Sequence, residues 1–258
     1  MIPAPRFSLL CQTDHSGREE RIARQVALTD DLQVLAARLE EIDQYAVDLV
    51  KGACLPVGNV KFLRRAMALA GITEPPNLSY PQVLHPYLHR KVSLMPAGSV
   101  IGRWFIKPVT TKAFTGFVVD TRDNPDHLSA HDRAQYNAFL ALPPETTVWV
   151  CEPVIWQSEV RYYVVDGEIL GEGRYDEGSD DALAPDRTVA REMAKRFAAT
   201  EGSPAACALD IGVLEGGTTA LVEVNDAWAL GFYSGTLDHR GYLEMLWRRW
   251  QQMLSARR

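Results

Sequence analysis

The sequence has few cysteines and none in a paired motif. Its 258 residues include four cysteines, which lie too far apart for the C-x-x-C spacing of zinc ribbons and thioredoxin-like redox sites. No apolar run approaches the roughly 18 residues that a membrane span requires, and the first twenty residues lack the hydrophobic segment of a signal peptide. We therefore expect a cytoplasmic protein with reduced, mostly buried thiols at Cys11, Cys54, Cys151 and Cys207.

The sequence also lacks an excess of positive charge. It contains 27 lysines and arginines against 33 aspartates and glutamates, a net charge of −6, so nothing in the overall charge suggests a nucleic acid or an acidic membrane as partner. Internal repeats and low-complexity segments are absent as well. The length allows one large domain or two small ones, each with its own core.

One stretch, residues 206–226, combines a hairpin pattern with opposed acids. Two apolar-rich runs flank Gly216-Gly217, a dipeptide suited to the positive φ angles of a tight turn. If these glycines form the loop, Glu215 pairs with Thr218, and counting back along both strands places Asp210 opposite Glu223 and Ala208 opposite Asn225. Because side chains alternate between the two faces of a strand, Asp210, Glu223 and Asn225 are expected on one face.

The opposite face of this hairpin is expected to enter the core, through Leu209, Ile211, Val213, Ala220, Val222 and Val224. Two carboxylates directly opposed across a hairpin repel each other, whereas a divalent cation between them reverses the sign of the interaction. Mg²⁺ prefers oxygen ligands of this kind. The alternative is a pair of exposed acids at the end of a hairpin, with Asn225 starting a turn.

A lysine near the end of a second apolar run also needs a partner. Residues 103–109 (RWFIKPV) read as a strand, residues 117–120 as its hairpin neighbour, and the loop 110–116 between them carries Lys112. Lys107 lies within the strand, and a buried lysine requires a counter-charge. Phosphate would provide one for Lys107 and for Lys112. The alternative is a snorkelling Lys107 and a solvated Lys112.

A further hairpin is predicted over residues 158–175, turning at Asp166-Gly167, a type I′ signal. Counting outward from the turn pairs Arg161 with Glu172 and Glu159 with Arg174, all on one face. This face is either a solvated, salt-bridged surface or an electropositive floor for a phosphate or carboxylate.

The remaining elements follow from apolar spacing and caps. Asn59 and Gly71 bound a helix over residues 60–70, Asp238 caps a final helix, and its Arg248-Arg249 pair is expected on a solvated edge. Residues 73–81 (TEPPNLSYP) resist regular structure and mark a boundary between sub-domains. We expect further strands at 7–11, 47–50 and 146–152, and further helices at 29–42, 129–142 and 185–199.

The order of these features resembles the ATP-grasp superfamily. The features are a strand lysine (Lys107), a short hinge after a strand (residues 152–155) and an acidic strand pair ending in VEVND. An arginine with two lysines (Arg161, Lys107, Lys112) is similar to a bacterial and phage clade of that superfamily. The resemblance implies an α+β fold of two lobes with antiparallel sheets over residues 91–258, preceded by a small α/β domain over residues 1–90.

The resemblance also implies ATP and Mg²⁺ as cofactors. The last strands of an ATP-grasp module bring an Asp and an E-x-N triplet to one or two Mg²⁺ ions, here Asp210, Glu223 and Asn225. The further site residues that it implies are Lys107 and Lys112 for the phosphates, the hinge backbone of Glu152, Pro153 and Val154 for adenine, Glu159 beside the nucleotide, and Arg161 and Arg174 for the transferring phosphate or the substrate carboxylate. Lys112 also counts among the catalytic candidates, because the loop TTKAFTG has only one glycine where many relatives have a longer glycine-rich loop.

The implied reaction is ATP-dependent ligation. A small-molecule or peptide carboxylate attacks the γ-phosphate, and an amine then displaces phosphate from the resulting acylphosphate to form an amide. Two alternatives remain open on the same fold. One is a kinase-like phosphotransferase, and the other is a non-catalytic nucleotide-binding or protein-interaction module, against which the complete set of Asp210, Glu223 and Asn225 argues.

Overall fold

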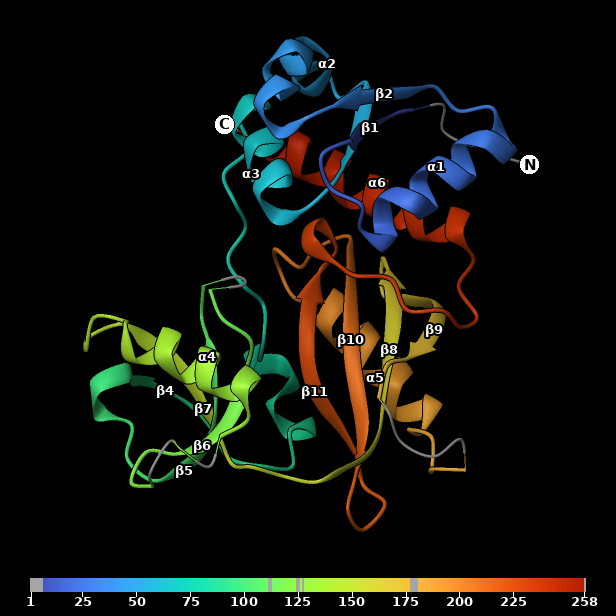
Figure 1. Cartoon of the computed structure of the whole chain (residues 1–258). Helices are drawn as coiled ribbons and strands as arrows, with labels where there is room; N and C mark the ends of the chain where they lie inside the picture. The colour runs from blue at the N-terminus through green and yellow to red at the C-terminus, as the bar shows by residue number, and fades with distance from the viewer. Residues whose placement is uncertain (1–6, 111–112, 124–125, 127, 177–180, 258) are drawn as a thin grey trace.

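The chain folds into three sheets that follow one another along the sequence (Figure 1). The computed structural model describes residues 7–110, 113–123, 126, 128–176 and 181–257. The first sheet is parallel, with strand order β2-β1-β3, and the other two are antiparallel, with orders β4-β7-β5-β6 and β11-β10-β8-β9. This is the expected α+β arrangement of two antiparallel lobes preceded by a small α/β unit.

The amino-terminal unit is built from short strands joined by helices. Asn59 caps helix α3 by accepting a hydrogen bond from the Phe62 amide at 3.0 Å, and Gly71 follows the helix with a φ of +72°, as the sequence predicts. The elements of the unit are β1 (Ser8–Gln12), α1 (Arg18–Asp30), β2 (Val34–Ala37), the 3-10 helix η1 (Leu39–Tyr45), α2 (Ala46–Lys51), β3 (Cys54–Val57) and α3 (Val60–Leu69).

The predicted helix over residues 29–42 is wrong. Helix α1 ends at Asp30, and Asp31 adopts a left-handed backbone with a φ of 52° that reverses the chain. The apolar residues that follow are divided between the edge strand β2 and helix η1, whose Ile42 is fully buried. Two short elements that each bury one side chain thus reproduce the apolar spacing of one long helix.

The predicted strand at residues 47–50 is also wrong, because this run lies in helix α2. Leu49 is buried, whereas Val47 and Val50 are 61% and 43% exposed. A short apolar run does not distinguish a strand from a one-sided helix, and here the helix packs only Leu49 inward.

The middle sheet carries one helix on its face. Ser129 caps this helix, accepting a hydrogen bond from the Asp132 amide at 3.0 Å, and Tyr136 and Phe139 pack against Ile106 and Val148 of the sheet. The elements are the 3-10 helix η2 (Gln82–Tyr87), β4 (Val92–Pro96), the 3-10 helix η3 (Ala97–Ser99), β5 (Arg103–Pro108), β6 (Phe117–Asp120), α4 (Ala130–Leu140) and β7 (Thr147–Cys151).

The third sheet is connected to the middle sheet by residues 152–155, which form no regular structure. Helix α5 packs Met193 and Phe197 against Leu209 and Ile211 of this sheet. The elements are β8 (Trp156–Val165), β9 (Glu168–Arg174), α5 (Arg187–Ala198), β10 (Ala206–Leu214), β11 (Thr219–Asp226) and the 3-10 helix η5 (Ala227–Ala229).

The last helix, α6 (His239–Ser255), returns to the amino-terminal unit (Figure 1). Its Trp250 and Leu254 share one hydrophobic core with Leu9 and Leu55. Asp238 caps it through the Gly241 amide at 2.6 Å, as predicted. Segments from opposite ends of the sequence therefore form one core above the hairpin of β10 and β11.

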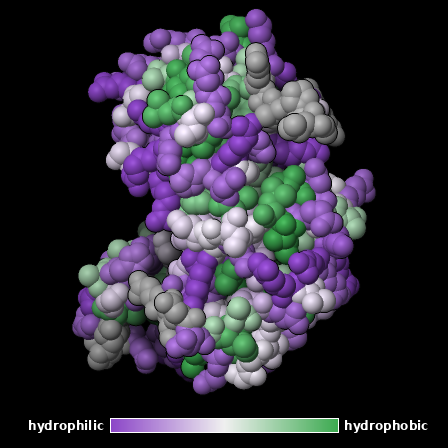
Figure 2. Space-filling model, turned by 90° about the vertical axis from the view of Figure 1, so that its right-hand side faces the viewer, coloured by the Kyte–Doolittle hydropathy of each residue, from purple (hydrophilic) through white to green (hydrophobic). Residues whose placement is uncertain are grey.

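The surface and the cysteines agree with the composition. Figure 2 shows a side of the molecule that is mostly hydrophilic, with a hydrophobic group near its middle. All four cysteines are free and buried, as predicted. Within the described ranges, no helix is long and apolar enough to cross a membrane.

Candidate active site

The acidic hairpin has the predicted register at its functional end. Asp210 pairs with Glu223, and Ala208 pairs with Asn225. The turn, however, is longer than predicted, because the Thr218 carbonyl accepts from the Leu214 amide at 2.9 Å and Val213 pairs with Thr219. A register shift between Asp210 and Ile211 compensates, so two departures from the simple count cancel at the acids.

The same shift corrects the predicted core face. Ile211 pairs with Leu221 rather than with Val222. Leu221 is fully buried in the core beside Val224, whereas Val222 is only half-buried. The extra residue in β11 therefore turns Val222 out of the core without moving Glu223.

A continuous polar chain crosses the cleft between the second and third sheets. Arg161 of β8 donates two hydrogen bonds of 2.7 Å to the Asp210 carboxylate. The Asn225 amide nitrogen donates to Asp210 Oδ2 and to Glu223 Oε1, both at 2.9 Å. Glu223 also forms an ion pair with Lys107 of β5. An amide and two cations thus hold the opposed carboxylates together.

Lys107 extends from the middle sheet toward this chain. Its side chain is 15% exposed, and its ammonium lies 5.6 Å from the centre of the Tyr80 ring. Burial lowers its pKa to about 8, although the Asp210 charge acts in the opposite direction. Lys107 does not snorkel into solvent; it lies in the cleft with Glu223 as its counter-ion.

The Arg161 guanidinium is fixed on every side. Its Nη1 donates to the Gly231 carbonyl at 3.0 Å, and its carbon lies 4.9 Å from the centre of the Tyr233 ring. Burial alone lowers the pKa of Arg161, but the Asp210 charge and hydrogen bonds outweigh it and raise that pKa. The group remains a permanent, oriented cation in an environment that excludes water.

The predicted pairs of the second hairpin are wrong. The turn lies at Asp166-Gly167 as expected, with positive φ at both residues, but the register shifts between Tyr163 and Val164. Arg161 therefore lies opposite Gly173, and Arg174 lies opposite Val160.

Because of this shift, the acids of the second hairpin find other partners. Glu172 pairs with Arg187 of α5 at 2.6 Å, and Arg174 pairs with Asp176 at 2.7 Å. Glu159 accepts a hydrogen bond from the Tyr175 hydroxyl at 2.7 Å, and burial raises the pKa of Glu159. The face is neither a solvated ion-pair surface nor a floor of unpaired arginines.

Three of the predicted site residues line one cavity of about 440 Å³, namely Lys107, Glu223 and Asn225. Gln135 of α4, Phe114–Gly116 of the loop and Trp228 of η5 line it as well. Asp210 and Arg161 lie directly behind Asn225 through the hydrogen bonds above. Of the other predicted residues, Glu152, Pro153 and Val154 lie in the connection between the sheets, away from this lining. Lys112 lies outside the described residues.

One pair at the site is missed by the sequence reasoning. Arg249 of α6 is 9% exposed and donates to Asp226 at 2.8 and 2.6 Å, so it does not lie on a solvated edge. Asp226 Oδ1 also accepts from the Trp228 amide at 3.1 Å, which caps η5. The only local signal is the position of Arg249 next to Trp250 on the apolar stripe of α6.

Comparison with known proteins agrees with this architecture. The model for family 2 of the ATP-grasp domains in the clade with one arginine and two lysines matches residues 87–245, more than half of the chain. The D-alanine–D-alanine ligase of Bacillus anthracis complexed with ATP superposes with a TM-score of 0.57 at 10% identity, covering 97% of this chain and 99% of that one. D-cycloserine synthetase DcsG superposes with a TM-score of 0.51 at 10% identity, covering 96% and 99%.

At such low identity, these structures show a shared fold alone. No curated protein matches the chain in sequence. The family match spans both antiparallel sheets and includes Lys107, Arg161, Asp210, Glu223 and Asn225. The chain therefore belongs to the ATP-grasp domain family, in family 2 of the clade with one arginine and two lysines.

Proposed function

We propose that this protein is an ATP-dependent ligase that joins a carboxylate to an amine through an acylphosphate. The observation that carries the proposal is the polar chain from Arg161 through Asp210, Asn225 and Glu223 to Lys107. It runs between two sheets and borders a cavity of about 440 Å³, a size suited to small-molecule ligands, which occupy about 300–1,000 Å³.

The two steps of this reaction need positioning and charge neutralisation. A carboxylate oxygen attacks the γ-phosphorus and ADP leaves; the amine nitrogen then attacks the acyl carbon and phosphate leaves, which closes the balance. We assign Lys107, with Lys112, to the phosphate oxygens, because an ammonium is a compact point charge. Arg161 and Arg174 are our candidates for the transferring phosphate or the substrate carboxylate, which a guanidinium fork binds bidentately.

The donor set of the acidic hairpin fits Mg²⁺. Among the described residues, no three His, Cys, Asp or Glu side chains gather as a metal site, so a cation here would need the amide of Asn225 beside Asp210 and Glu223. A carboxylate has about four acceptor positions; Arg161 and Asn225 fill three on Asp210. The Asn225 oxygen adds a neutral ligand, and all three are hard oxygen donors.

We propose that Asp210, Glu223 and Asn225 hold Mg²⁺, which supplies positive charge against the phosphate oxygens of the nucleotide. In the structure Glu223 faces Lys107 instead. Lys107 therefore needs to move only from one anionic partner to another, from the Glu223 carboxylate to a phosphate, when the nucleotide binds. Both partners keep the buried ammonium compensated.

The nucleotide base and the domain division remain proposals. We assign the adenine edge to the backbone of Glu152, Pro153 and Val154, with Glu159 nearby, because this connection joins the two sheets. We also retain residues 1–90 and 91–258 as the two units. Helix α6 packs into the core of the first unit, so neither unit buries all of its apolar surface alone.

A trapping experiment tests the ligase function. The protein is incubated with ATP, Mg²⁺, a mixture of amino acids and hydroxylamine, which intercepts an acylphosphate as a hydroxamate. We expect hydroxamate and ADP in equal amounts. Lys107→Met should lose both products, whereas Lys195→Met, at a 65% exposed lysine of α5, should retain them.

The alternatives give other products. ADP release with a phosphorylated product that persists in hydroxylamine would establish a phosphotransferase. Saturable ATP binding with neither ADP nor hydroxamate, for this mixture and for peptide carboxylates, would establish a non-catalytic module and refute the ligase.

A further inference from the structure

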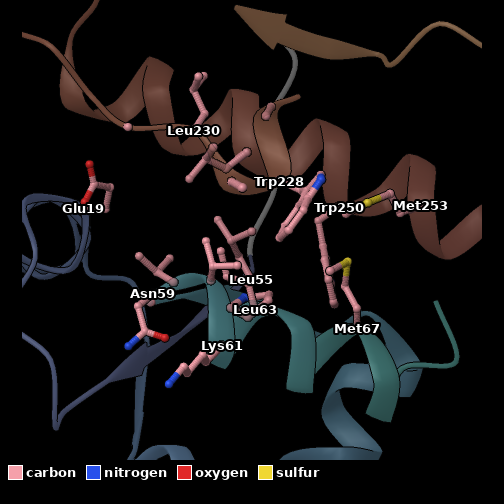
Figure 3. A pocket seen from close by; sticks show the side chains of 18 of the residues that line it. Glu19, Leu55, Asn59, Lys61, Leu63, Met67, Trp228, Leu230, Trp250 and Met253 are labelled. Carbon is pink, nitrogen blue, oxygen red and sulfur yellow. The ribbon is translucent and has the colours of Figure 1, made fainter. Parts of the chain in front are cut away.

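A second cavity lies on the other side of helix η5 from the acidic site. Its volume is about 480 Å³, and it is enclosed by β3 and α3 of the amino-terminal unit on one side and by η5 and α6 on the other (Figure 3). Its walls are mainly apolar, with Leu55, Leu63, Met67, Trp228, Trp250 and Met253 among them. None of the site residues predicted from the sequence lies here.

The cavity has an apolar end and a polar end. Figure 3 shows Met67, Trp250 and Met253 together at one end, and Glu19 and Asn59 at the other. Trp250 and Met253 are only 3% and 5% exposed, so the apolar end is deep. Aromatic and methionine side chains form walls that match large apolar groups and adapt to their shape.

The polar end lies against the acidic site. Trp228 and Ala229 line both cavities, so η5 is a shared wall. Arg161, which pairs with Asp210, also holds the Gly231 carbonyl at 3.0 Å, and Gly231 lines this second cavity. Glu19 accepts from the Phe232 amide at 3.1 Å. A ligand anchored in the apolar end therefore has its polar end next to the residues proposed for catalysis.

We propose that this cavity binds the large apolar side chain, aromatic or branched aliphatic, of an amino-acid or peptide substrate. The inference rests on the proposed ligase function and adds the class of substrate. An apolar lining without an apolar occupant loses dispersion contacts and stays in contact with water, so burying such a side chain is favourable. The cavity volume lies within the range of about 300–1,000 Å³ for small-molecule sites.

Binding can be measured without turnover. Isothermal titration calorimetry without ATP or Mg²⁺ would compare phenylalaninamide with alaninamide, and N-acetylphenylalanine with N-acetylalanine. The first pair mimics an amine substrate and the second a carboxylate substrate. We expect at least one phenylalanine probe to bind at least about tenfold more tightly than its alanine counterpart, because about 25 cal/mol is gained per Å² of apolar surface buried.

Matched variants on one helix locate the binding. Leu63→Trp fills the cavity from α3 and should weaken binding of that probe at least tenfold. Leu69→Trp makes the same change at a partly buried leucine of α3 outside the cavity lining and should leave binding unchanged. If Leu63→Trp does not fold, as its melting curve would show, Leu63→Ala should favour a larger probe, tryptophanamide or N-acetyltryptophan, over the phenylalanine probe.

The outcomes separate this proposal from the ligase function. Phenylalanine probes that bind no better than alanine probes would overturn it, as would a folded Leu63→Trp variant that binds like the parent. Selective binding without any hydroxamate would leave the cavity assignment intact while the ligase function fails. Hydroxamate formation that is equally fast in folded Leu63→Trp and in the parent, over the full amino-acid mixture, would retain the ligase and refute the apolar specificity.

Discussion

Two buried arginine–aspartate pairs hold the hairpin of β10 and β11, and they have nearly the same geometry. Arg161 binds Asp210 through two hydrogen bonds of 2.7 Å, and Arg249 binds Asp226 through bonds of 2.8 and 2.6 Å. Exposure of the four side chains is also similar, at 9% and 2% for the first pair and 10% and 5% for the second. Geometry and burial alone do not distinguish their roles.

The neighbours of each pair distinguish them. Asp210 passes its hydrogen bonds on to Asn225, and through it to Glu223 and Lys107 at the cleft. Asp226 borders the same cavity, but its remaining hydrogen bond caps η5.

Arg249 in turn donates to Gln252, one turn further along α6, at 2.7 Å. One ion pair therefore continues into a polar site, and the other fastens the end of β11 to α6. The same side-chain pair supports function or stability according to what lies next to it.

The largest effect is expected from breaking the fastening pair. Arg249→Met keeps the length of the side chain but leaves Asp226 buried without its cation, which should lower the free energy of unfolding by about 3–5 kcal/mol. Urea denaturation measures it. Arg248→Met, one residue earlier, removes a pair with Asp166 that is 50% and 55% exposed and should cost about 0–1 kcal/mol. Equal losses in the two variants would contradict the assigned role of Arg249.

The next effect separates the functional pair from the fastening one. Glu223→Gln removes the charge at the far end of the Asp210 chain and should reduce ATP turnover roughly 100- to 1,000-fold. It should also lower stability in chelator, because Lys107 loses its counter-ion. Glu215→Gln makes the same change at the exposed turn of the same hairpin and should leave both unchanged. Normal turnover in Glu223→Gln would remove this residue from the site.

Ligand binding should strengthen the functional side of the comparison. ATP with Mg²⁺ should stabilise the protein by about 2.7 kcal/mol at a hundredfold excess over Kd, visible as a higher Tm. ATP with a chelator should stabilise it much less, because Asp210 and Glu223 then meet the phosphates without a cation between them. A Tm shift of the same size with and without metal would place the nucleotide away from the acidic hairpin.

The smallest effect is a pH dependence that belongs to the functional side. The pKa of Lys107 is lowered by burial from 10.5 to about 8, so between these values the unfolded chain binds more protons than the native protein. Stability in chelator should therefore rise with pH in this window, by up to about 1.4 kcal/mol per pH unit. Urea denaturation at pH 8.5 and 9.5 measures the difference from Lys107→Met. An unchanged difference would mean that Lys107 is not buried as an ammonium.

The order and type of most elements could be read from local patterns. Glycine turns, the caps at Asn59, Ser129 and Asp238, and the alternation along β10 and β11 act within a few residues, so each appears in the sequence. The failures occur where one pattern fits two structures. The apolar spacing over residues 29–42 suits one helix or two shorter elements, and the run at residues 47–50 suits a strand or a short helix.

The composition of the candidate site could be predicted in part. Asp210, Glu223 and Asn225 share a face because strands alternate, and this holds although a longer turn and a register shift change the count. The cross-strand pairs of the second hairpin fail because a comparable shift between Tyr163 and Val164 has no compensating change in its turn. Such shifts depend on how a strand packs, which counting residues does not reveal.

The sequence by itself determined which residue types carry charge on each strand and where the chain turns. Only the tertiary structure decided which charges meet, because partners such as Lys107 and Glu223 come from different sheets. The two arginines are equally charged in sequence, and so are the two aspartates. Packing of α6 against the amino-terminal unit directs Arg249 to Asp226, while strand pairing directs Arg161 to Asp210. A buried charge must find its partner where the folded chain places one, since leaving it unpaired costs several kcal/mol.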